Sequence, residues 1–274
     1  MAESKNWGVG VVVLAIKVLV RGTWHVSLSE SATAPERKSL SQAFLNCAEV
    51  ISYSGEYSVP EVFGWAEEDG QGFLYMELVD APTLTRCWGQ LGEEGRVELC
   101  RELGGMVRAW RGLVQQQGGR GGYIGSVTKL PSNDIRLGCR PHLHSPWLGP
   151  RAVENLHDIC YIELKPDTPE TLTALTAITF THNDLAPCNV LVRPSPGIPG
   201  TPPRVAAVID WAQAGWYPAC WEWCKAELTD MPLGEGMSRE EQAEWKEKYL
   251  PLAVEALPDE GVFWPWKRFA VTYS

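Results

Sequence analysis

Two fragments of this chain join an apolar strand to a polar loop, and they restrict its fold more than any other feature of the sequence. In FTHNDLAPCNVLV (180–192), a short polar loop with His182 and Asp184 runs straight into an apolar strand. In RVAAVIDWAQAGWYP (204–218), an apolar strand ends on Asp210. Taken singly, each of these polar side chains is typical of a turn or a helix cap. Together they favour a fold that brings the ends of two apolar strands to one place.

An antiparallel hairpin between residues 189–192 and 205–209 meets this requirement. In such a pair, the first residue of one strand lies near the last residue of the other, so we expect Asn189 beside Asp210. The loop that carries Asp184 leads to the same open end. Two carboxylates and an amide oxygen form a hard, all-oxygen site, which suits Mg²⁺ because this ion binds through one or two carboxylates and substrate phosphates. The spacing therefore predicts a magnesium site at the open end of the hairpin.

The first third of the chain is rich in strand patterns. Valine-rich residues 9–20 and the runs 59–65 and 73–79 have the composition of strands, with an acidic, glycine-containing turn between the last two. Residues 35–52 have a proline-marked entry and apolar positions at helical spacing, which predicts a helix. The sequence DAPTL then interrupts the pattern, so we place a domain boundary near Asp80.

The remainder of the chain is mainly helical. The clearest helix follows Glu93, where apolar side chains recur every three or four residues: Cys100, Leu103, Val107, Trp110 and Val114. The pair Gly104 and Gly105 would weaken this helix by about 1 kcal/mol per glycine relative to alanine, so we expect packing to hold it. A further helix is predicted at SREEQAEWKEKYL (238–250).

The composition restricts the partners and the compartment. A formal net charge of -10 argues against a protein that binds nucleic acid along its phosphate backbone. The apolar run 9–20 is too short to span a membrane, Lys17 interrupts it, and no convincing cleavage site follows, so we expect neither a membrane span nor a signal peptide. The eight cysteines include no C-x-x-C pair, which excludes the usual zinc spacing and predicts reduced thiols in a cytoplasmic protein. The sequence leaves the oligomeric state open.

The polar loop also matches a known catalytic pattern. His182, Asp184, Leu185 and, after three residues, Asn189 fit H-x-D-L-x-x-x-N, the catalytic-loop spacing of protein kinases. Asp210 in IDW falls where those enzymes carry the metal-binding aspartate of D-F-G. The sequence THNDLAPCNVLV, followed by VIDWAQAGWYPACWEW, resembles the motifs of the aminoglycoside phosphotransferase and choline kinase family more closely than those of protein kinases. Together with VPEVFGW and FLYMELVDAPTL, the resemblance extends over residues 59–225.

This resemblance implies a fold, an activity and roles for residues. The fold would be protein-kinase-like and α+β, with a nucleotide-binding lobe at 1–80 that ends in the inter-lobe linker and a helical catalytic lobe at 81–274. The activity would be an ATP- and Mg²⁺-dependent transfer of the γ-phosphate to a hydroxyl of an amino-sugar-like or choline-like small molecule. Asp184 would accept or orient the hydroxyl proton, and His182 would tie the loop to the lobe. The metal ligands would be Asn189 and Asp210.

On the nucleotide side the resemblance leaves alternatives open. Lys17, in the sequence AIK, is the candidate for the phosphate-anchoring lysine, although it is equally well an outward-facing strand residue. Its acidic partner would be Glu49 or Glu36, and the sequence does not choose between them. Backbone groups near Glu77 and Val79 would pair with the adenine edge; otherwise this segment is an edge strand and a turn.

Three departures from the family pattern favour an alternative. Gly8 and Gly10 form only a lone G-x-G, which is weak support for a phosphate-cradling loop, so the first lobe could be truncated. Asn183 replaces the usual glycine, and Gln213 stands where the family often has an acid. A pseudokinase that acts as a binding or scaffolding module is therefore the second reading. A metal-dependent hydrolase built on the histidine and the two aspartates ranks third, because it lacks further ligands.

Overall fold

The computed structural model describes part of the 274-residue chain. The described residues are 15–19, 23–27, 59–68, 71–115, 123–127, 132, 134, 147–148, 177–193, 202–231, 236–257, 263 and 266–267. The helix expected at 35–52 lies outside these residues, as do Glu36, Glu49, Gly8 and Gly10. For Lys17, only the backbone is described.

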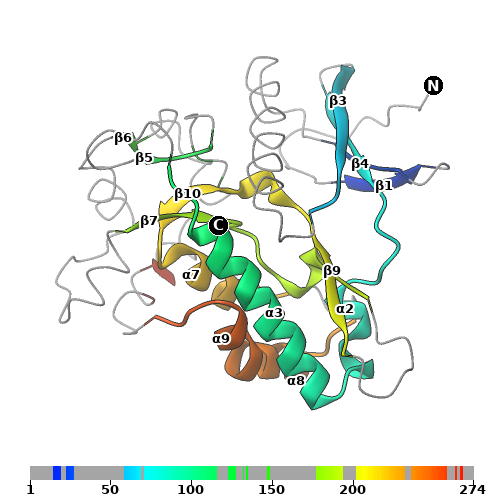
Figure 1. Ribbon diagram of the computed structural model, residues 1–274, viewed down its shortest axis with the longest axis vertical. Helices are drawn as coiled ribbons and strands as arrows, with labels where there is room; N and C mark the ends of the chain where they lie inside the picture. Colours follow the sequence, from blue (N-terminus) through cyan, green and yellow to red (C-terminus); the bar gives the residue numbers. More distant parts are fainter. Residues whose placement is uncertain are drawn as a thin grey trace.

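The first sheet has four antiparallel strands in the order β1-β2-β4-β3 (Figure 1). These strands are β1 (Ala15–Leu19), β2 (Thr23–Ser27), β3 (Val62–Glu68) and β4 (Gln71–Glu77). The predicted bounds 59–65 and 73–79 were wrong by a few residues, because the ladder continues through polar positions to the pair Glu68 and Gln71. A backbone ladder needs no apolar side chain, so the apolar run alone did not mark its ends.

The long helix of the chain is α3 (Glu93–Arg111), preceded by α2 (Leu84–Cys87) and the 3₁₀ turn η1 (Trp88–Gln90). Four of its five predicted apolar positions are buried as expected, but Val114 is 82% exposed. The helix ends at the C-cap Gly112, so Val114 lies beyond the last turn and does not belong to its apolar face.

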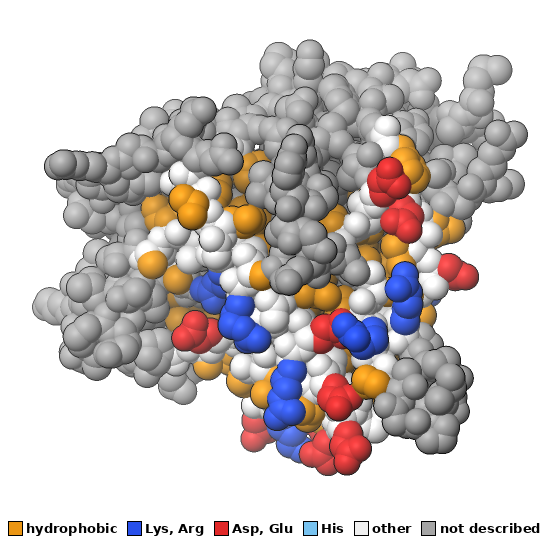
Figure 2. Space-filling view, in the orientation of Figure 1, with side chains coloured by type: hydrophobic (Ala, Val, Ile, Leu, Met, Phe, Trp, Pro, Cys, Tyr) orange, Lys and Arg blue, Asp and Glu red, His pale blue; other side chains and the backbone are white. Residues whose placement is uncertain are grey.

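The C-terminal helices pack against α3. They are α8 (Arg239–Glu244), the π-helical turn η5 (Trp245–Tyr249) and α9 (Leu250–Ala253). Ser238 caps α8 through a capping box with Glu241, as expected for SREE. On the outer side, acidic and basic side chains are intermixed over α3 and α8 (Figure 2), and one contact there joins Arg96 to Glu244 at 3.1 Å. The helices thus combine an apolar inner face with a polar outer face.

Two further ladders pass through the centre of the molecule and carry the polar fragments. One pairs β8 (Val190–Arg193) with β9 (Arg204–Val208), and the other pairs β7 (Ile178–Thr181) with β10 (Gly215–Pro218). Helix α7 (Trp221–Leu228) follows β10. A short third ladder joins β5 (Tyr123–Ile124) to β6 (Trp147–Leu148).

Contacts from α3 and the linker hold the β8–β9 hairpin. The Glu102 carboxylate on α3 accepts from the Arg204 side chain at 2.8 Å and from the Val205 amide at 3.0 Å. The segment that follows β4 lies against β8, where the Val192 amide donates to the Pro82 carbonyl at 2.9 Å. The described part of the chain is α+β, as predicted, and contains no helix long and apolar enough to cross a membrane.

Candidate active site

The open end of the β8–β9 hairpin brings Asn189 and Asp210 together, as the sequence predicted. Val190 pairs with Val208 in the ladder, and one step further the Ile209 amide donates to the Asn189 carbonyl at 2.9 Å. Asn189 ends the 3₁₀ turn η3 (Pro187–Asn189) immediately before β8. Asp210 follows directly on Ile209, so the two side chains start from adjacent points of the backbone.

Asp210 has a left-handed backbone conformation, with φ 66° and ψ 57°. Few residue types adopt this conformation, and aspartate is among those that do. It precedes the 3₁₀ turn η4 (Trp211–Gln213), but its side chain makes no capping hydrogen bond to that turn.

The Asn189 side chain holds Asp184 at the same open end of the β8–β9 hairpin. Its Nδ2 group donates to the Asp184 carbonyl at 2.8 Å and to the Asp184 carboxylate at 3.3 Å. Because the amide nitrogen faces Asp184, the acceptor oxygen of Asn189 is turned the other way. Asp184 and Asn189, from residues 180–192, and Asp210, from residues 204–218, thus form one cluster.

The two carboxylates of this cluster are partly buried, and they repel each other. Burial raises the pKa of Asp210 to about 7, and the nearby charge of Asp184 raises it as well. Burial also raises the pKa of Asp184, while Lys225 and the hydrogen bond from Asn189 oppose this rise. A bound cation would relieve both the burial cost and the mutual repulsion. The charge distribution therefore fits a divalent metal ion.

His182 lies beneath the cluster and is completely buried. Its Nε2 lies 3.0 Å from the Ile209 carbonyl, and its Nδ1 accepts from the Asp184 amide at 3.2 Å. These two partners assign the Nε2–H tautomer. Burial lowers the pKa of His182 to about 3, so the ring is neutral. With both nitrogens engaged, His182 has no lone pair for a metal, and this argues against the hydrolase reading.

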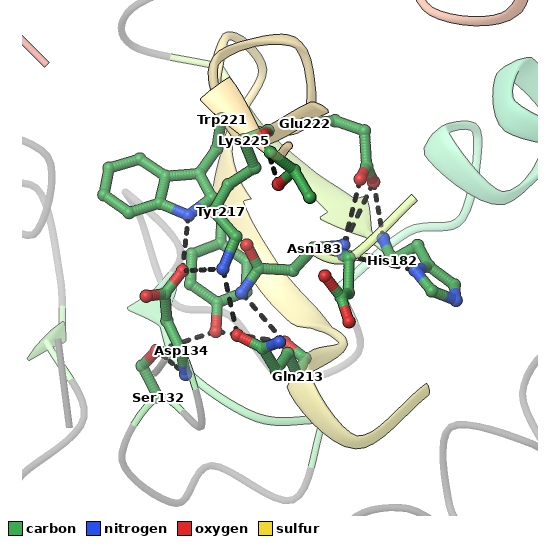
Figure 3. A network of polar contacts seen from close by, with 11 residues as sticks. Ser132, Asp134, His182, Asn183, Gln213, Tyr217, Trp221, Glu222 and Lys225 are labelled. Carbon is green, nitrogen blue, oxygen red and sulfur yellow. Dashed lines mark hydrogen bonds and ion pairs between the residues drawn. The ribbon is translucent and has the colours of Figure 1, made fainter. Parts of the chain in front are cut away.

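Glu222 on α7 anchors the loop from behind, a function that the sequence did not suggest. Its carboxylate accepts from the His182 amide at 2.7 Å and from the Asn183 amide at 3.1 Å (Figure 3). The side chain is 1% exposed, and burial raises its pKa to about 6. Its hydrogen-bond partners are therefore backbone amides of the loop. Only tertiary structure brings α7 next to this loop.

The conformation of Asn183 explains how an asparagine can stand where the family pattern usually has a glycine. Its φ is 67°, a conformation that glycine adopts without strain and asparagine tolerates. The Asn183 Nδ2 group donates to the Gln213 carbonyl at 3.0 Å, which joins the catalytic loop to the turn after Asp210. The substitution of asparagine for glycine therefore preserves the backbone geometry and adds one contact.

A buried ion pair lies beside the loop. Lys225 on α7 donates to Asp134 at 3.2 Å and to the Gln213 side chain at 2.9 Å (Figure 3). Trp221 donates to the same Asp134 carboxylate at 2.9 Å, and neither charged side chain exceeds 4% exposure. No local pattern in the sequence indicates this network, because Asp134 and Lys225 are 91 residues apart.

Glu77 and Val79, which we predicted to contact adenine, belong to a segment that lies next to the β8–β9 hairpin. Glu77 ends β4, and its amide donates to the Glu61 carbonyl at 2.7 Å. Val79 packs with Leu191 and Ala207 of the hairpin, and its carbonyl accepts from the Ala81 amide at 2.9 Å. The segment proposed for adenine recognition and the cluster of Asp184, Asn189 and Asp210 are thus attached to the same hairpin.

The described residues include no group of three or more His, Cys, Asp or Glu side chains that could hold a metal ion. The cluster has instead two carboxylates and an amide, a ligand set that Mg²⁺ accepts when phosphates complete the shell. The structure shows no disulfide bond at the five cysteines of the described segments.

Comparisons with known proteins agree with these observations. A family model described as "Phosphotransferase enzyme family" matches residues 18–226. Among solved structures, an aminoglycoside 3'-phosphotransferase of type VIII is 14% identical, with 96% of this chain and 93% of that chain covered and a TM-score of 0.49. The gentamicin complex of APH(2'')-IIa is 14% identical, with 91% and 77% covered and a TM-score of 0.44. ADP-bound APH(2'')-Ib is 13% identical, with 93% and 80% covered and a TM-score of 0.45. No curated protein matches the chain.

Proposed function

This chain belongs to the phosphotransferase enzyme family. We propose that it has a protein-kinase-like α+β fold and that it transfers the γ-phosphate of ATP to a hydroxyl group of a small molecule. The observation that carries the proposal is the cluster of Asp184, Asn189 and Asp210 at one hairpin end. An amino-sugar-like or choline-like acceptor suits the net charge of -10, since an acidic protein favours a cationic ligand.

Asp210 and the amide oxygen of Asn189 would hold Mg²⁺. When bound, the ion supplies charge neutralisation for the phosphates. The left-handed backbone of Asp210 and the donation from Asn189 Nδ2 to Asp184 already fix the direction of both ligands. These residues therefore need little rearrangement to hold a cation, which is what electrostatic preorganisation requires.

Asp184 would orient the acceptor hydroxyl and take up its proton. Three contacts keep its carboxylate and backbone in place: the Asn189 amide, the His182 ring that accepts from its backbone, and the buried Glu222 that fixes the preceding amides. The chain thus contributes position and charge, which dominate catalysis of phosphoryl transfer.

For the nucleotide, we propose Lys17 as the phosphate anchor, with Glu49 or Glu36 as its partner, and backbone groups near Glu77 and Val79 as the adenine contacts. Lys17 lies centrally in β1, opposite His25 of β2, and the linker packs on the hairpin that carries the metal cluster. This arrangement corresponds to a nucleotide-binding lobe at 1–80 and a catalytic lobe at 81–274.

The test is loss of turnover without loss of fold. We expect Asp184→Ala and Asp210→Ala each to lower kcat at least about 10³-fold, because each removes a group that acts on the reacting centre. The assay is ADP release from ATP and Mg²⁺ with gentamicin, glucosamine or choline as acceptor. Circular dichroism and thermal melting check that both variants remain folded.

Asp230→Ala is the matched control, because this carboxylate is 83% exposed and pairs only with Lys246 at the surface. It should leave kcat unchanged. Near-normal turnover in either cluster variant would contradict the role of that aspartate. A wild-type protein whose melting temperature does not respond to millimolar ATP with Mg²⁺ would instead support the scaffolding alternative.

A further inference from the structure

Asn183 links the catalytic loop to the turn that follows Asp210. Its Nδ2 group donates to the Gln213 carbonyl at 3.0 Å, and Gln213 ends the 3₁₀ turn η4, which begins directly after Asp210 (Figure 3). The preceding residue makes an equivalent contact on the other side of Asp210, where His182 Nε2 donates to the Ile209 carbonyl at 3.0 Å. The two residues immediately before the proposed proton acceptor thus hold the chain on both sides of Asp210.

The chemistry of the partner fixes how the Asn183 amide points. A backbone carbonyl only accepts hydrogen bonds, so the NH₂ group of Asn183 must face Gln213. The Oδ1 atom of Asn183 is then left buried and without a hydrogen-bond partner among the described residues, which is unfavourable for folding. The left-handed backbone, with φ 67°, adds strain that a glycine would not have. These two costs favour glycine at this position, so stability does not account for the asparagine.

The Gln213 carbonyl does not depend on Asn183 for a donor. The Tyr217 hydroxyl donates to the same oxygen at 3.3 Å, so loss of the Asn183 side chain would leave no unpaired carbonyl. Tyr217 lies only four residues further along the chain, in β10. Its contact therefore ties the turn to the strand that follows it, whereas the Asn183 contact ties the turn to the catalytic loop.

We propose that Asn183 is a positioning residue, which fixes the turn after Asp210 against the catalytic loop and so holds the Asp210 carboxylate in the direction of the metal ion. The inference rests on the proposed phosphotransferase function and its magnesium site. In this role Asn183 touches neither the metal ion nor a substrate, and it acts through the backbone between Gln213 and Asp210. Residues that orient a metal ligand typically change metal affinity by about 10- to 100-fold when they are substituted.

Asn183→Gly removes the contact but keeps the left-handed backbone, so metal affinity and stability should diverge. With ADP present, we expect the dissociation constant of Mn²⁺, measured from free Mn²⁺ by electron paramagnetic resonance, to rise about tenfold. Mn²⁺ serves as the probe because it accepts the same oxygen ligands as Mg²⁺. The unfolding equilibrium constant of the metal-free protein should stay within about fivefold of the wild type.

Two results with this variant would overturn the inference. One is an unchanged dissociation constant of Mn²⁺. The other is a loss of stability as large as the loss of metal affinity, because Asn183 would then support the fold in general and not the position of Asp210.

Asn183→Ala separates the lost donor from the greater freedom of glycine. Alanine also lacks the amide, but its backbone has less conformational freedom than that of glycine. If the lost donor is the cause, the two variants should bind Mn²⁺ equally weakly, within about threefold of each other. A loss confined to one of the two variants would assign the effect to backbone freedom or to strain, and would contradict the proposed role.

Gln115→Ala is the matched control. Gln115 Nε2 donates to the Tyr123 carbonyl at 2.8 Å, as the Asn183 amide donates to Gln213, and Gln115 also accepts from the Tyr123 amide at 3.0 Å. Because both contacts join it to Tyr123 and not to the cluster, this variant should bind Mn²⁺ like the wild type. An equal rise of the dissociation constant in the control would show that the effect is not specific to Asn183, and would refute the inference.

Kinetics give an independent measurement. In the ADP-release assay, the Mg²⁺ concentration for half-maximal rate should rise about tenfold in Asn183→Gly, with the KM for the acceptor changed less than about threefold. An equal rise in both would contradict an action through Asp210. A wild type that binds no Mn²⁺ in the presence of ADP would refute the proposed metal site, and this inference with it. A wild type that binds Mn²⁺, together with an Asn183→Gly variant that binds it equally well, would count against the positioning role alone.

Discussion

At the scale of single residues, two left-handed positions define the site. Asn183 and Asp210 have φ values of 67° and 66°, and they are the non-glycine residues with positive φ in the described segments. Asp210, which follows β9, belongs to the cluster of Asp184, Asn189 and Asp210, and Asn183 precedes Asp184 in the loop after β7. Strained backbone at an active site persists because surrounding contacts hold it, and here Glu222 and Gln213 supply those contacts to Asn183.

Asn183 gives a residue-scale prediction with an unusual order of stability. Asn183→Ala places a Cβ-bearing residue without a polar side chain at positive φ, whereas Asn183→Gly removes that strain. Both variants remove Asn183 Oδ1, a buried oxygen without a hydrogen-bond partner among the described residues, so this loss does not affect their comparison. We therefore expect Asn183→Ala to be about 1 kcal/mol less stable than Asn183→Gly, as measured by urea unfolding. An alanine variant as stable as the glycine variant would contradict the left-handed conformation.

At the scale of elements, the contact between α3 and α9 decides how the long helix is held. A Cβ built on Gly104 would lie 2.2 Å from the Leu252 carbonyl oxygen, whereas the nearest atom to a Cβ on Gly105 is the tip of Arg108 at 3.9 Å. The two adjacent glycines thus have different effects on the helix. Gly104 permits the close approach of α9, and Gly105 only weakens the helix.

This difference predicts opposite effects of one substitution at neighbouring positions. Gly104→Ala should lower the free energy of unfolding by about 1–3 kcal/mol, because α9 must move away. Gly105→Ala should raise it by up to about 1 kcal/mol, because alanine is the better helix former. Thermal or urea unfolding of the two variants tests this, and each serves as the control of the other. The same sign in both would mean that α9 does not pack on Gly104.

At the scale of the whole molecule, buried ionisable groups make stability depend on pH in two opposite ways. The pKa of Asp210 is raised to about 7, so its contribution is present at low pH and is lost as the pH rises through this value. The pKa of His182 is lowered to about 3, so its contribution is present above the ordinary histidine pKa and is lost on acidification. In the wild type these two contributions offset each other between these limits.

Asp210→Asn should separate the two contributions. Without metal, the free energy of unfolding of the variant relative to the wild type should increase between pH 4 and pH 8, by on the order of 2–4 kcal/mol, because only the wild type must ionise a buried carboxyl. Chemical unfolding in EDTA at several pH values measures the difference. Saturating Mg²⁺ at pH 8 should stabilise the wild type and not the variant. A difference that stays constant with pH would mean that the carboxyl of Asp210 is not buried in the folded protein.

The sequence alone determined the hairpin and its chemistry. The polar residues at the ends of two apolar strands predicted that Asn189 lies beside Asp210, and the ladder confirms it, because antiparallel pairing leaves one way to align short apolar strands. The α3 and α8 helices were also predictable, since helical periodicity and a capping box are local signals. The boundary near Asp80 and the roles of Lys17, Glu49, Glu77 and Val79 stay predictions.

Tertiary structure alone decided what surrounds the cluster. Three charged residues from distant parts of the chain lie next to the loop: Glu222, Lys225 and Asp134. Their electrostatic interactions are strong because the side chains are buried, and no local sequence pattern specifies this burial. The error at Val114 has a different cause, because this residue keeps the helical spacing but lies beyond the end of its helix at Gly112. Spacing along the chain fixes which side chains share a strand end, whereas desolvation and long-range contacts fix how those side chains ionise and point.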